Sequence, residues 1–335
     1  MPRCGSQVIL CGLPIRFDTY TGCSHLCKYC FAQKKANLEN IRVSERAGTL
    51  EAFIRGERTQ ETIWCDWDIP IHWGGLSDPF QPLEEKYKES LRCLEVFAET
   101  GYPFVVSTKG RLITSPEYLS FIKDCNCVVQ ISMVSPRYDV LEKGAPTYAE
   151  RMQMVETLAH TGKRVNIRIQ PYMTEVHDDV VKSMQAYRDA GAYGVIVEGM
   201  KFFKRKPGLV KVGGDYCYPK DILQRRFAEV KEEAHQNKLR FYCGENRLRN
   251  MGDSLTCCGI DGLGWKENAY NLCHLLNGAN AESTERMREP GTARCFKALE
   301  QTSASSKNIK GKTFAGYMAE YYMAKTDYIH SLFGK

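Results

Sequence analysis

Short apolar stretches alternate with amphipathic stretches along the first 240 residues, a rhythm typical of repeated β-α units. The predicted strands are 15–20, 69–75, 104–109, 127–133, 164–170 and 193–199. The predicted helices are 44–54, 82–99, 115–124, 147–160 and 178–190, and a further helix at 219–237 precedes a seventh candidate strand at 239–243. This alternation predicts an α/β protein with a parallel sheet.

Two of these strands carry polar side chains along one face. Asn166, Arg168 and Gln170 alternate with valine and isoleucine in one strand, and Gln130 and Ser132 share a face of another. A buried polar face is costly unless it lines a polar cavity, whereas an antiparallel edge strand can turn such a face to solvent. The β-α alternation favours an open barrel whose lumen holds a polar ligand near the carboxyl ends of the strands.

The regular pattern dissolves beyond residue 240. Residues 244–311 predict a loop-rich segment, and 316–333 predict a C-terminal helix. We therefore divide the chain into a barrel core at 1–240 and a partly helical extension at 241–335. The extension is a candidate substrate lid or auxiliary metal region.

Composition narrows the class of protein without naming a partner. The 335 residues are 43% hydrophobic and 26% charged, and the net charge of +6 does not by itself imply a polyanionic ligand. No apolar run reaches the roughly 18 residues of a membrane span, and the first residues show no signal-peptide cleavage site. We expect a cytoplasmic protein with no membrane contact, whose 15 cysteines are mostly reduced.

Three cysteines crowd into the stretch TGCSHLCKYCFAQ, at Cys23, Cys27 and Cys30. Structural zinc takes four ligands in short-spaced pairs, and only Cys27-x-x-Cys30 fits that pattern. A disulfide cannot use three thiols. Iron–sulfur clusters take thiolates from such runs, usually four, so three would leave one iron open to a small molecule.

The spacing Cys23-x3-Cys27-x2-Cys30 after a first strand, with Tyr29 before the last cysteine, resembles the signature of the radical S-adenosylmethionine (SAM) superfamily. The resemblance implies a partial (β/α)6 TIM-like barrel over about 14–240. It also implies that the three cysteines bind a [4Fe–4S] cluster whose fourth iron binds SAM. An external one-electron reductant of the flavodoxin or ferredoxin type then drives cleavage of SAM to a 5′-deoxyadenosyl radical, which abstracts hydrogen from a substrate.

The resemblance also implies residues that contact SAM. Gly74 and Gly75 in IHWGGLSDPFQP match the family's Gly-Gly-Glu motif for the SAM amine, but Leu76 stands where the acid is expected. Ser77 or Asp78 is then the candidate to contribute, and a plain glycine turn is the alternative.

Four further positions complete the predicted SAM site. Ser132 and Arg168 stand where similar enzymes hold the ribose and the carboxylate of SAM, Glu198 lies in the adenine region, and Tyr29 borders the cluster. An arginine fork suits a carboxylate, although a structural ion pair is the alternative for Arg168. No residue is assigned to hydrogen transfer.

The substrate is less well defined by the sequence. SDPFQPLE, STKG and RIQPYM resemble the spore photoproduct lyase-like branch of nucleic-acid-associated enzymes. The segment KFFKRKPGLVK offers Lys201, Lys204, Arg205 and Lys206 to phosphates, or is merely a solvated loop. Peptide or protein modification, small-metabolite modification and a non-catalytic metal-binding module are the alternatives, and the polar strand faces favour an enzyme.

A second cluster is a further hypothesis. Its candidate ligands in the extension are Cys243, Cys257, Cys258 and Cys273. Their gaps match no local ligand spacing, and scattered core cysteines are the alternative.

Overall fold

A computed structural model describes residues 1–4, 11–34, 37–59, 62, 68–212 and 214–268. Its main feature is an eight-stranded sheet, in which every neighbouring pair from β2 onward is parallel and only β1 is antiparallel. In spatial order, the strands are β1 (Arg3–Cys4), β2 (Ile15–Phe17), β5 (Ile71–Trp73), β6 (Phe104–Thr108), β7 (Cys127–Ser132), β8 (Arg164–Tyr172), β9 (Gly194–Gly199) and β12 (Arg240–Cys243). The sheet's two ends do not pair with each other, so it is an open barrel.

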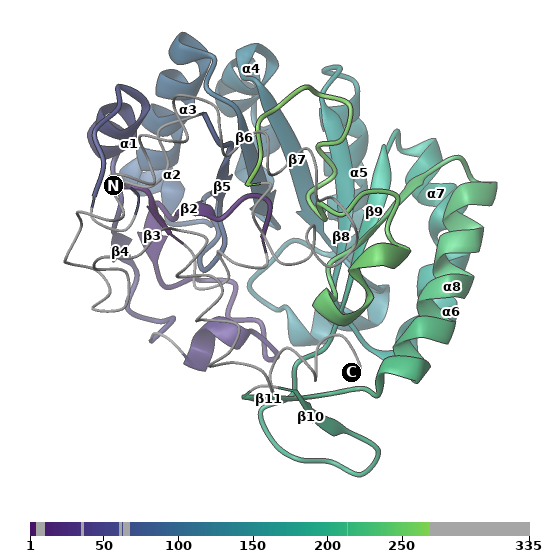
Figure 1. The fold of residues 1–335 in the computed structure, drawn as a ribbon. Helices are drawn as coiled ribbons and strands as arrows, with labels where there is room; N and C mark the ends of the chain where they lie inside the picture. Colours follow the sequence, from purple (N-terminus) through teal and green to yellow (C-terminus); the bar gives the residue numbers. More distant parts are fainter. Residues whose placement is uncertain (5–10, 35–36, 60–61, 63–67, 213, 269–335) are drawn as a thin grey trace, which may run out of the picture.

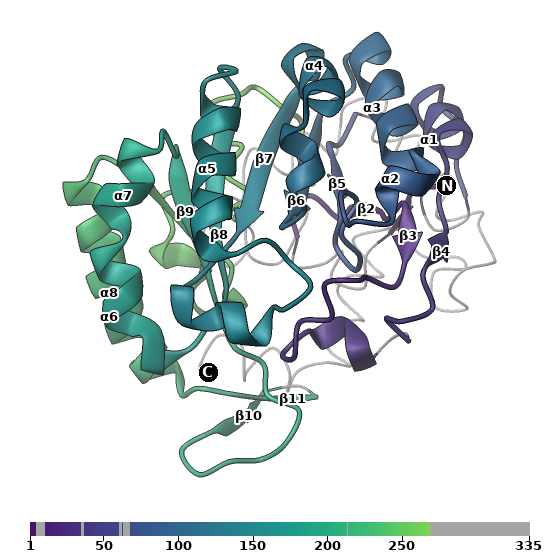
Figure 2. The same ribbon diagram turned by 180° about the vertical axis from the view of Figure 1, so that it is seen from behind.

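Helices cover one face of the sheet (Figures 1 and 2). They are α1 (Ala47–Ile54), α2 (Glu84–Tyr87), α3 (Glu89–Thr100), α4 (Pro116–Asp124), α5 (Tyr148–Ala159), α6 (His177–Lys182), α7 (Met184–Asp189) and α8 (Lys220–Gln236). Short 3-10 turns include η2 (Phe31–Lys34), η3 (Arg111–Thr114), η4 (Pro136–Leu141), η5 (Thr174–Val176) and η6 (Asn246–Met251). Two hairpins, β3 (Tyr20–Thr21) with β4 (Arg42–Val43) and β10 (Val210–Val212) with β11 (Asp215–Cys217), lie outside the sheet.

The α/β class and the open parallel barrel are confirmed, and the polar strands are not an antiparallel edge. The seventh candidate strand is present as β12, so the sheet continues past residue 240 to Cys243. The single helix expected at 82–99 is wrong in one detail, because it breaks into α2 and α3 at Lys88, which has a φ of 49°. The backbone amides of Ser90 and Leu91 donate to the Glu84 carboxylate there, which starts the second helix on a new axis. The helix expected at 316–333 lies outside the described residues.

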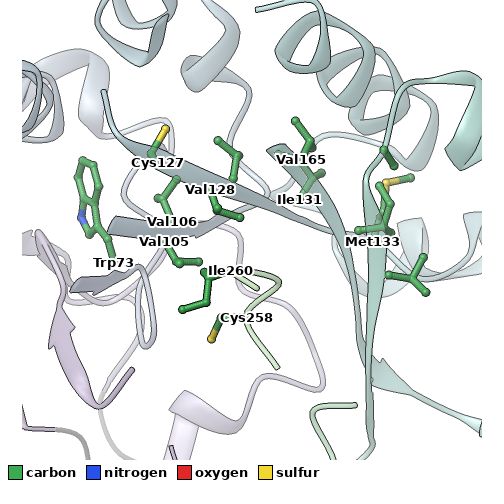
Figure 3. Packing of buried hydrophobic residues seen from close by; sticks show 14 of the residues in the cluster. Trp73, Val105, Val106, Cys127, Val128, Ile131, Met133, Val165, Cys258 and Ile260 are labelled. Atoms are coloured by element: carbon green, nitrogen blue, oxygen red, sulfur yellow. The ribbon is translucent and has the colours of Figure 1, made fainter. Parts of the chain in front are cut away.

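The main hydrophobic core lies between the sheet and the helices (Figure 3). Trp73 is fully buried, and its ring centroid lies 5.4 Å from Phe80, 5.7 Å from Phe97 and 5.8 Å from Phe104. Aromatic side chains bury large apolar areas, so this group joins β5 and β6 to α3. The core therefore fixes the outer face of the sheet and leaves the lumen face to polar chemistry.

The segment after η6 packs on the lumen face, opposite the helices (Figure 1). Cys258 and Ile260 are buried there, and the Cys258 carbonyl accepts a hydrogen bond of 3.1 Å from the Gln130 side chain. Arg164 donates to the carbonyls of Gly259 and Asp261. Part of the predicted extension thus closes the lumen at the amino-terminal ends of the strands.

Replacing Trp73 by alanine should lower the free energy of unfolding by about 3–5 kcal/mol, the usual cost of emptying a large buried aromatic site. Urea denaturation of the purified protein measures this change. Val140, whose side chain is 65% exposed, provides the control, because Val140→Ala should change the stability by less than about 0.5 kcal/mol. Equal stability of the two variants would contradict this account of the core.

Candidate active site at the carboxyl ends of the strands

The three loop cysteines stand at the ends of successive tight turns. The Leu26 amide donates to the Cys23 carbonyl, the Cys30 amide to the Cys27 carbonyl, and the Gln33 amide to the Cys30 carbonyl. Each of these bonds joins residues i and i+3, so the loop is tightly wound from Cys23 to Gln33. Cys23 lies near enough to Cys27, and Cys27 to Cys30, for a charge on one to raise the pKa of the other. The turns thus gather the three thiols in one place.

The thiols suit a cluster better than a single metal ion. All three are free, and burial raises the pKa of Cys23 to about 12 and that of Cys27 to about 11. Within the described residues, no three His, Cys, Asp or Glu side chains are arranged as ligands of one metal ion. A [4Fe–4S] cluster takes each thiolate on a different iron, so it does not require the three sulfurs to converge on one point. The donor set, three thiols on one short loop, therefore fits the implied cluster.

Gln81, in the segment that follows β5, is hydrogen-bonded to the backbone of the cysteine loop. Its side chain is fully buried; its oxygen accepts from the Ser24 amide at 2.9 Å, and its nitrogen donates to the Gly22 carbonyl at 3.3 Å. These bonds hold the backbone on both sides of Cys23. Gly22 itself has a φ of +79°, and a Cβ there would lie 2.6 Å from the Leu38 carbonyl oxygen.

Asp78 connects the segment after β5 to the end of β6 and to the cysteine loop. Its carboxylate accepts from the Thr108 hydroxyl at 2.6 Å and from the Lys109 amide at 2.6 Å, and it lies 3.2 Å from Nε2 of His25. Burial alone would raise the pKa of Asp78, but His25 and these hydrogen bonds lower it to about 2. The structure therefore places Asp78 beneath the cysteine loop, with its oxygens committed to protein groups.

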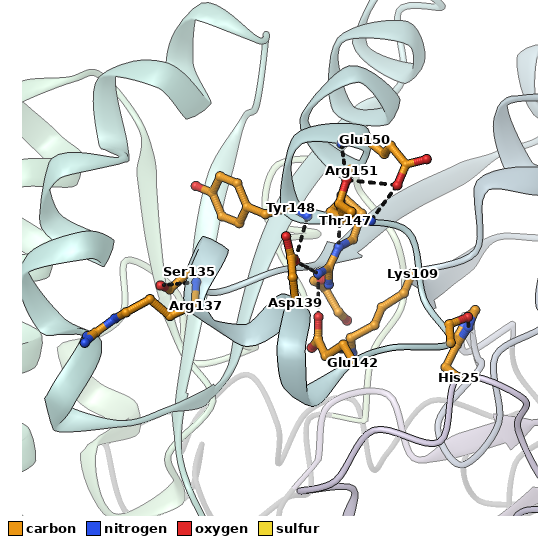
Figure 4. Close-up of polar contacts among 12 residues, drawn as sticks. His25, Lys109, Ser135, Arg137, Asp139, Glu142, Thr147, Tyr148, Glu150 and Arg151 are labelled. Carbon is orange, nitrogen blue, oxygen red and sulfur yellow. Dashed lines mark hydrogen bonds and ion pairs between the residues drawn. The ribbon is translucent and has the colours of Figure 1, made fainter.

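A buried ion network forms the other wall of the loop (Figure 4). Arg151 is fully buried, pairs with Glu142 and donates to the Ser132 carbonyl at 2.7 Å. The Tyr29 hydroxyl also donates to Glu142, and Nζ of Lys109 lies 5.9 Å from the Tyr29 ring. Tyr29 therefore anchors the loop to the segment that follows β7.

The paired glycines form the turn at the end of β5. Gly74 has a φ of +82°, and a Cβ there would lie 2.5 Å from the Ser107 carbonyl oxygen, so only glycine fits. One oxygen of Asp18 accepts from the amides of Leu76 at 2.8 Å and Ser77 at 3.2 Å. Asp18, on the segment after β2, therefore supports the turn in which Leu76 replaces the expected acid.

The polar strand faces meet in the lumen as one hydrogen-bonded network. Nη1 of Arg168 donates to the side-chain oxygen Oε1 of Gln130 at 2.8 Å, and its Nε donates to Oε1 of Gln170 at 2.5 Å. The Ser107 hydroxyl donates to the same Gln130 oxygen at 2.8 Å. The network brings predicted residues of β7 and β8 together, and Ser132 lies level with Arg168 in the register of these strands.

Glu198 closes the network at the end of β9. Its carboxylate accepts from Gln170 at 2.8 Å, lies 2.7 Å from Nζ of Lys201, and lies 3.9 Å from Arg168. Burial would raise the pKa of Glu198, but Lys201 and Arg168 lower it, so the group is ionised. Lys201 therefore points to the lumen, while Lys204, Arg205 and Lys206 are exposed on the loop before β10.

Sequence reasoning missed three residues of this site: Arg16, His72 and Gln81. Arg16 and His72 are single polar residues at the centres of the three-residue strands IRF and IHW, and they face each other in register. That isolated polar position is the signal that could have identified them. The role of Gln81 depends on a contact across 57 residues of sequence and carries no local signal.

The described cysteines of the extension give no sign of a second cluster. Cys243 is buried in β12 and donates to the Glu245 carbonyl, while Cys257 and Cys258 lie beside each other in the lumen. No metal-binding group is found among the described residues, and Cys273 lies outside them. The prediction of a second cluster has no support here.

A cavity of about 480 Å³ lies at the opposite end of the barrel. Its walls come from the residues that begin or precede β7, β8 and β9, including Cys127, Arg164 and Tyr193, together with Trp265. The strands point away from this cavity, so it is separate from the cysteine loop.

Family comparison agrees with this geometry. The model of the radical SAM superfamily matches residues 18–191, just over half of the chain. The matched range contains the cysteine loop, the paired glycines and the lumen positions of β6 to β8. The chain therefore belongs to the radical SAM superfamily.

Curated relatives are distant and partial. Uncharacterized proteins of Mycobacterium tuberculosis and Mycobacterium bovis are each 24% identical over 207 residues. The match covers 56% of this chain and 59% of each relative, so the chain spans less than two thirds of their length.

Solved structures share the fold at low sequence identity. A spore photoproduct lyase complexed with dinucleoside spore photoproduct has a TM-score of 0.55 and 15% identity, over 69% of this chain and 76% of that chain. Streptococcus suis SuiB bound to S-adenosylmethionine has a TM-score of 0.51 and 13% identity, over 81% and 67% respectively. At these identities, the likeness shows the common barrel fold.

Among the described helices, none is both long enough and apolar enough to cross a bilayer.

Replacing Gln81 by leucine should loosen the cysteine loop without unfolding the barrel. Iron bound by the three thiols should then pass to a chelator on the order of tenfold faster, the usual scale for losing a residue that orients metal ligands. Absorbance of the iron–chelator complex over time measures the rate. Gln185→Leu is the control, because Gln185 is exposed on α7 and bonds only to Asp189. A wild-type rate in Gln81→Leu would show that the clamp does not hold the loop.

Proposed function

We propose that this chain is a radical SAM enzyme in which Cys23, Cys27 and Cys30 hold a [4Fe–4S] cluster. The observation that carries the proposal is the placement of three gathered thiols at the carboxyl ends of the strands, directly above a polar lumen. When bound, the cluster would supply one-electron reduction of SAM at the expense of an external reductant, and the products of that cleavage would be methionine and a 5′-deoxyadenosyl radical able to take hydrogen from the substrate. A non-catalytic binding module has no use for the polar lumen.

The chain's own residues would orient SAM and exclude water. The half-buried backbone of Gly74 and Gly75 would receive the amine, and the hydroxyl of Ser132 the ribose. The guanidinium of Arg168 would receive the carboxylate, and Glu198 would border the adenine. Ser77 and Asp78 support the glycine turn and the cysteine loop, so we place them behind the SAM site. Tyr29 holds the loop against Glu142.

Nucleic acid is the substrate class that we propose, on the evidence of the exposed loop that follows β9. Lys204, Arg205 and Lys206 are exposed there without a carboxylate partner among the described residues. The ring of Phe202 on this loop packs edge-to-face against Tyr218 at 5.3 Å, so it is occupied within the protein and not offered to bases. Phosphate contacts therefore remain as the main source of affinity. Modification of a peptide or a small metabolite is the alternative, and a cytoplasmic location stays a prediction.

Replacing Cys27 by alanine should abolish reductive cleavage of SAM, because one of the three cluster thiolates is lost. The measurement is formation of 5′-deoxyadenosine by reduced, anaerobically reconstituted protein. Cys93→Ala is the control, because Cys93 is a buried thiol on α3 and should leave cleavage intact. Product formation by Cys27→Ala, or zinc in place of iron in the wild type, would contradict the cluster assignment.

Single-stranded oligonucleotides should bind with an affinity that falls with salt at a log–log slope of about −2, because three phosphate contacts each contribute about 0.7. Fluorescence anisotropy across a salt series measures the slope. Joint replacement of Lys204, Arg205 and Lys206 by alanine should remove this dependence. The charge-matched control replaces three exposed cations on the outer helices, Lys123, Lys182 and Arg225. Equal binding by the two triple variants would exclude the loop as a nucleic-acid contact.

A further inference from the structure

Arg16 projects into the lumen from the centre of β2. Its neighbours in the strand, Ile15 and Phe17, are fully buried on the opposite, core face. A Cβ built on Gly75 would lie 3.6 Å from Nη1 of Arg16, so the guanidinium sits against the paired-glycine turn. The side chain is only partly buried and therefore remains accessible from the lumen.

The hydrogen-bond partners of Arg16 are a histidine and a cysteine, and neither is a carboxylate. Nη1 donates to Nδ1 of His72, and Nη2 lies 3.6 Å from the Cys11 sulfur. The Ser107 hydroxyl donates to Gln130, so it accepts at 3.0 Å from Nε2 of His72, which must carry the ring proton. Burial, with Arg16 and Arg168 nearby, lowers the pKa of His72 and keeps the ring neutral.

The nearest carboxylate does not neutralise Arg16. Asp18 binds the amides of Leu76 and Ser77 and pairs with Arg3 at 3.3 Å. No ion pair within 4.0 Å joins Arg16 to a carboxylate in the described part of the chain. The guanidinium thus lacks an acidic partner.

The nearby thiols do not supply a dedicated counter-charge either. Burial and the hydrogen bond with Cys257 raise the pKa of Cys258, which faces Arg16 as a neutral thiol. The bond from Cys258 lowers the pKa of Cys257, with further help from Arg249 and Arg168. A negative charge on Cys257 is therefore stabilised first by the hydrogen bond from Cys258 and then by those two arginines.

Asn166 on β8 also has side-chain polar atoms without a hydrogen-bond partner, but a Cβ built on Gly259 would lie 2.4 Å from its Nδ2, so it belongs to the closed end of the lumen. Arg16, which lies against the paired-glycine turn, is the group that can still receive a ligand. Buried polar groups are normally hydrogen-bonded, and buried cations are normally paired. An anion with further acceptor atoms would satisfy an arginine fork, which donates two parallel bonds to a carboxylate or a phosphate.

We propose that Arg16 is an anion-binding residue of the lumen, which receives a carboxylate or phosphate group of a bound ligand. The proposal rests on the proposed function for its setting, because two sources could supply that group. One is the carboxylate of SAM, whose amine is placed at the adjacent glycines. The other is an anionic group of the substrate. Either source makes Arg16 a specificity residue, separate from Arg168.

The first arm of the test compares SAM with decarboxylated SAM, which lacks only the carboxylate. Calorimetry on cluster-loaded wild type, Arg16→Met and Arg168→Met gives the affinities. If Arg16 takes the SAM carboxylate, Arg16→Met should bind SAM about 10- to 100-fold more weakly, the range for charge-assisted hydrogen bonds. Its affinity for decarboxylated SAM should match that of the wild type.

The second arm asks whether the anion comes from the substrate. Pyrophosphate is titrated into the same proteins saturated with SAM. If Arg16 takes a substrate anion, Arg16→Met should keep wild-type SAM affinity but lose the pyrophosphate binding of the wild type. Arg16→Lys retains the charge without the fork, so its pyrophosphate affinity should lie between the two.

Controls separate this proposal from the proposed function. Arg225→Met removes an equal charge from the exposed surface of α8 and should behave as wild type in both arms. Iron content and thermal midpoint report whether Arg16→Met folds, and Arg16→Lys replaces it if it does not. Wild-type binding of both SAM and pyrophosphate by the folded Arg16 variant would overturn the proposal. Absence of SAM binding in the wild type itself would instead count against the proposed function, while the pyrophosphate titration, repeated without SAM, would still test Arg16.

Discussion

The buried carboxylate of Asp78 is the interaction on which the mouth of the barrel depends. It bonds to the end of β6 through Thr108 and Lys109, to its own turn through Phe80, and to the cysteine loop through His25. Its pKa of about 2 lies below the ordinary value of 3.8, so its ionised form contributes stability above about pH 4. That contribution is lost as the pH falls towards 2. A cysteine loop without its own sheet pairing is thereby fixed to two strands.

The two faces of the sheet are stabilised by different physics. The outer face buries aromatic and branched side chains such as Trp73 and Phe104 against helices, which supplies most of the favourable free energy of folding. The lumen face carries Arg168, Gln130 and Glu198 in a network whose members restrict one another's rotamers. Because stability comes from the outer face, the lumen can keep polar groups that await a ligand.

Much of the fold could be predicted, because β-α alternation and strand periodicity are local properties of the sequence. The grouping of the thiols could also be predicted, because Cys23, Cys27 and Cys30 lie in one short loop that local i to i+3 hydrogen bonds wind tightly. The hydrogen-bond and ion-pair partners of individual polar side chains could not be predicted from the sequence. Asp78 was predicted to contribute to the amine site, yet the structure turns its oxygens to Thr108 and Lys109, which a chain separation of about thirty residues conceals. Lys201 was grouped with the surface cations, but Glu198 three residues earlier draws it to the lumen.

The distribution of charge links the cysteine loop to the lumen below it. The Glu198 carboxylate forms its closer ion pair with Lys201, at 2.7 Å, and lies 3.9 Å from Arg168. Arg16 forms no ion pair with a carboxylate among the described residues. Arg16 thus places a positive charge without an ion-pair partner beside a wall of low dielectric, where Coulomb attraction is stronger than in water. Such an environment attracts an anionic ligand and orients its charged end towards the arginines. The protein needs that charge for a ligand rather than for its fold, because the neutral relay of His72, Ser107 and Gln130 already holds both guanidinium groups in place.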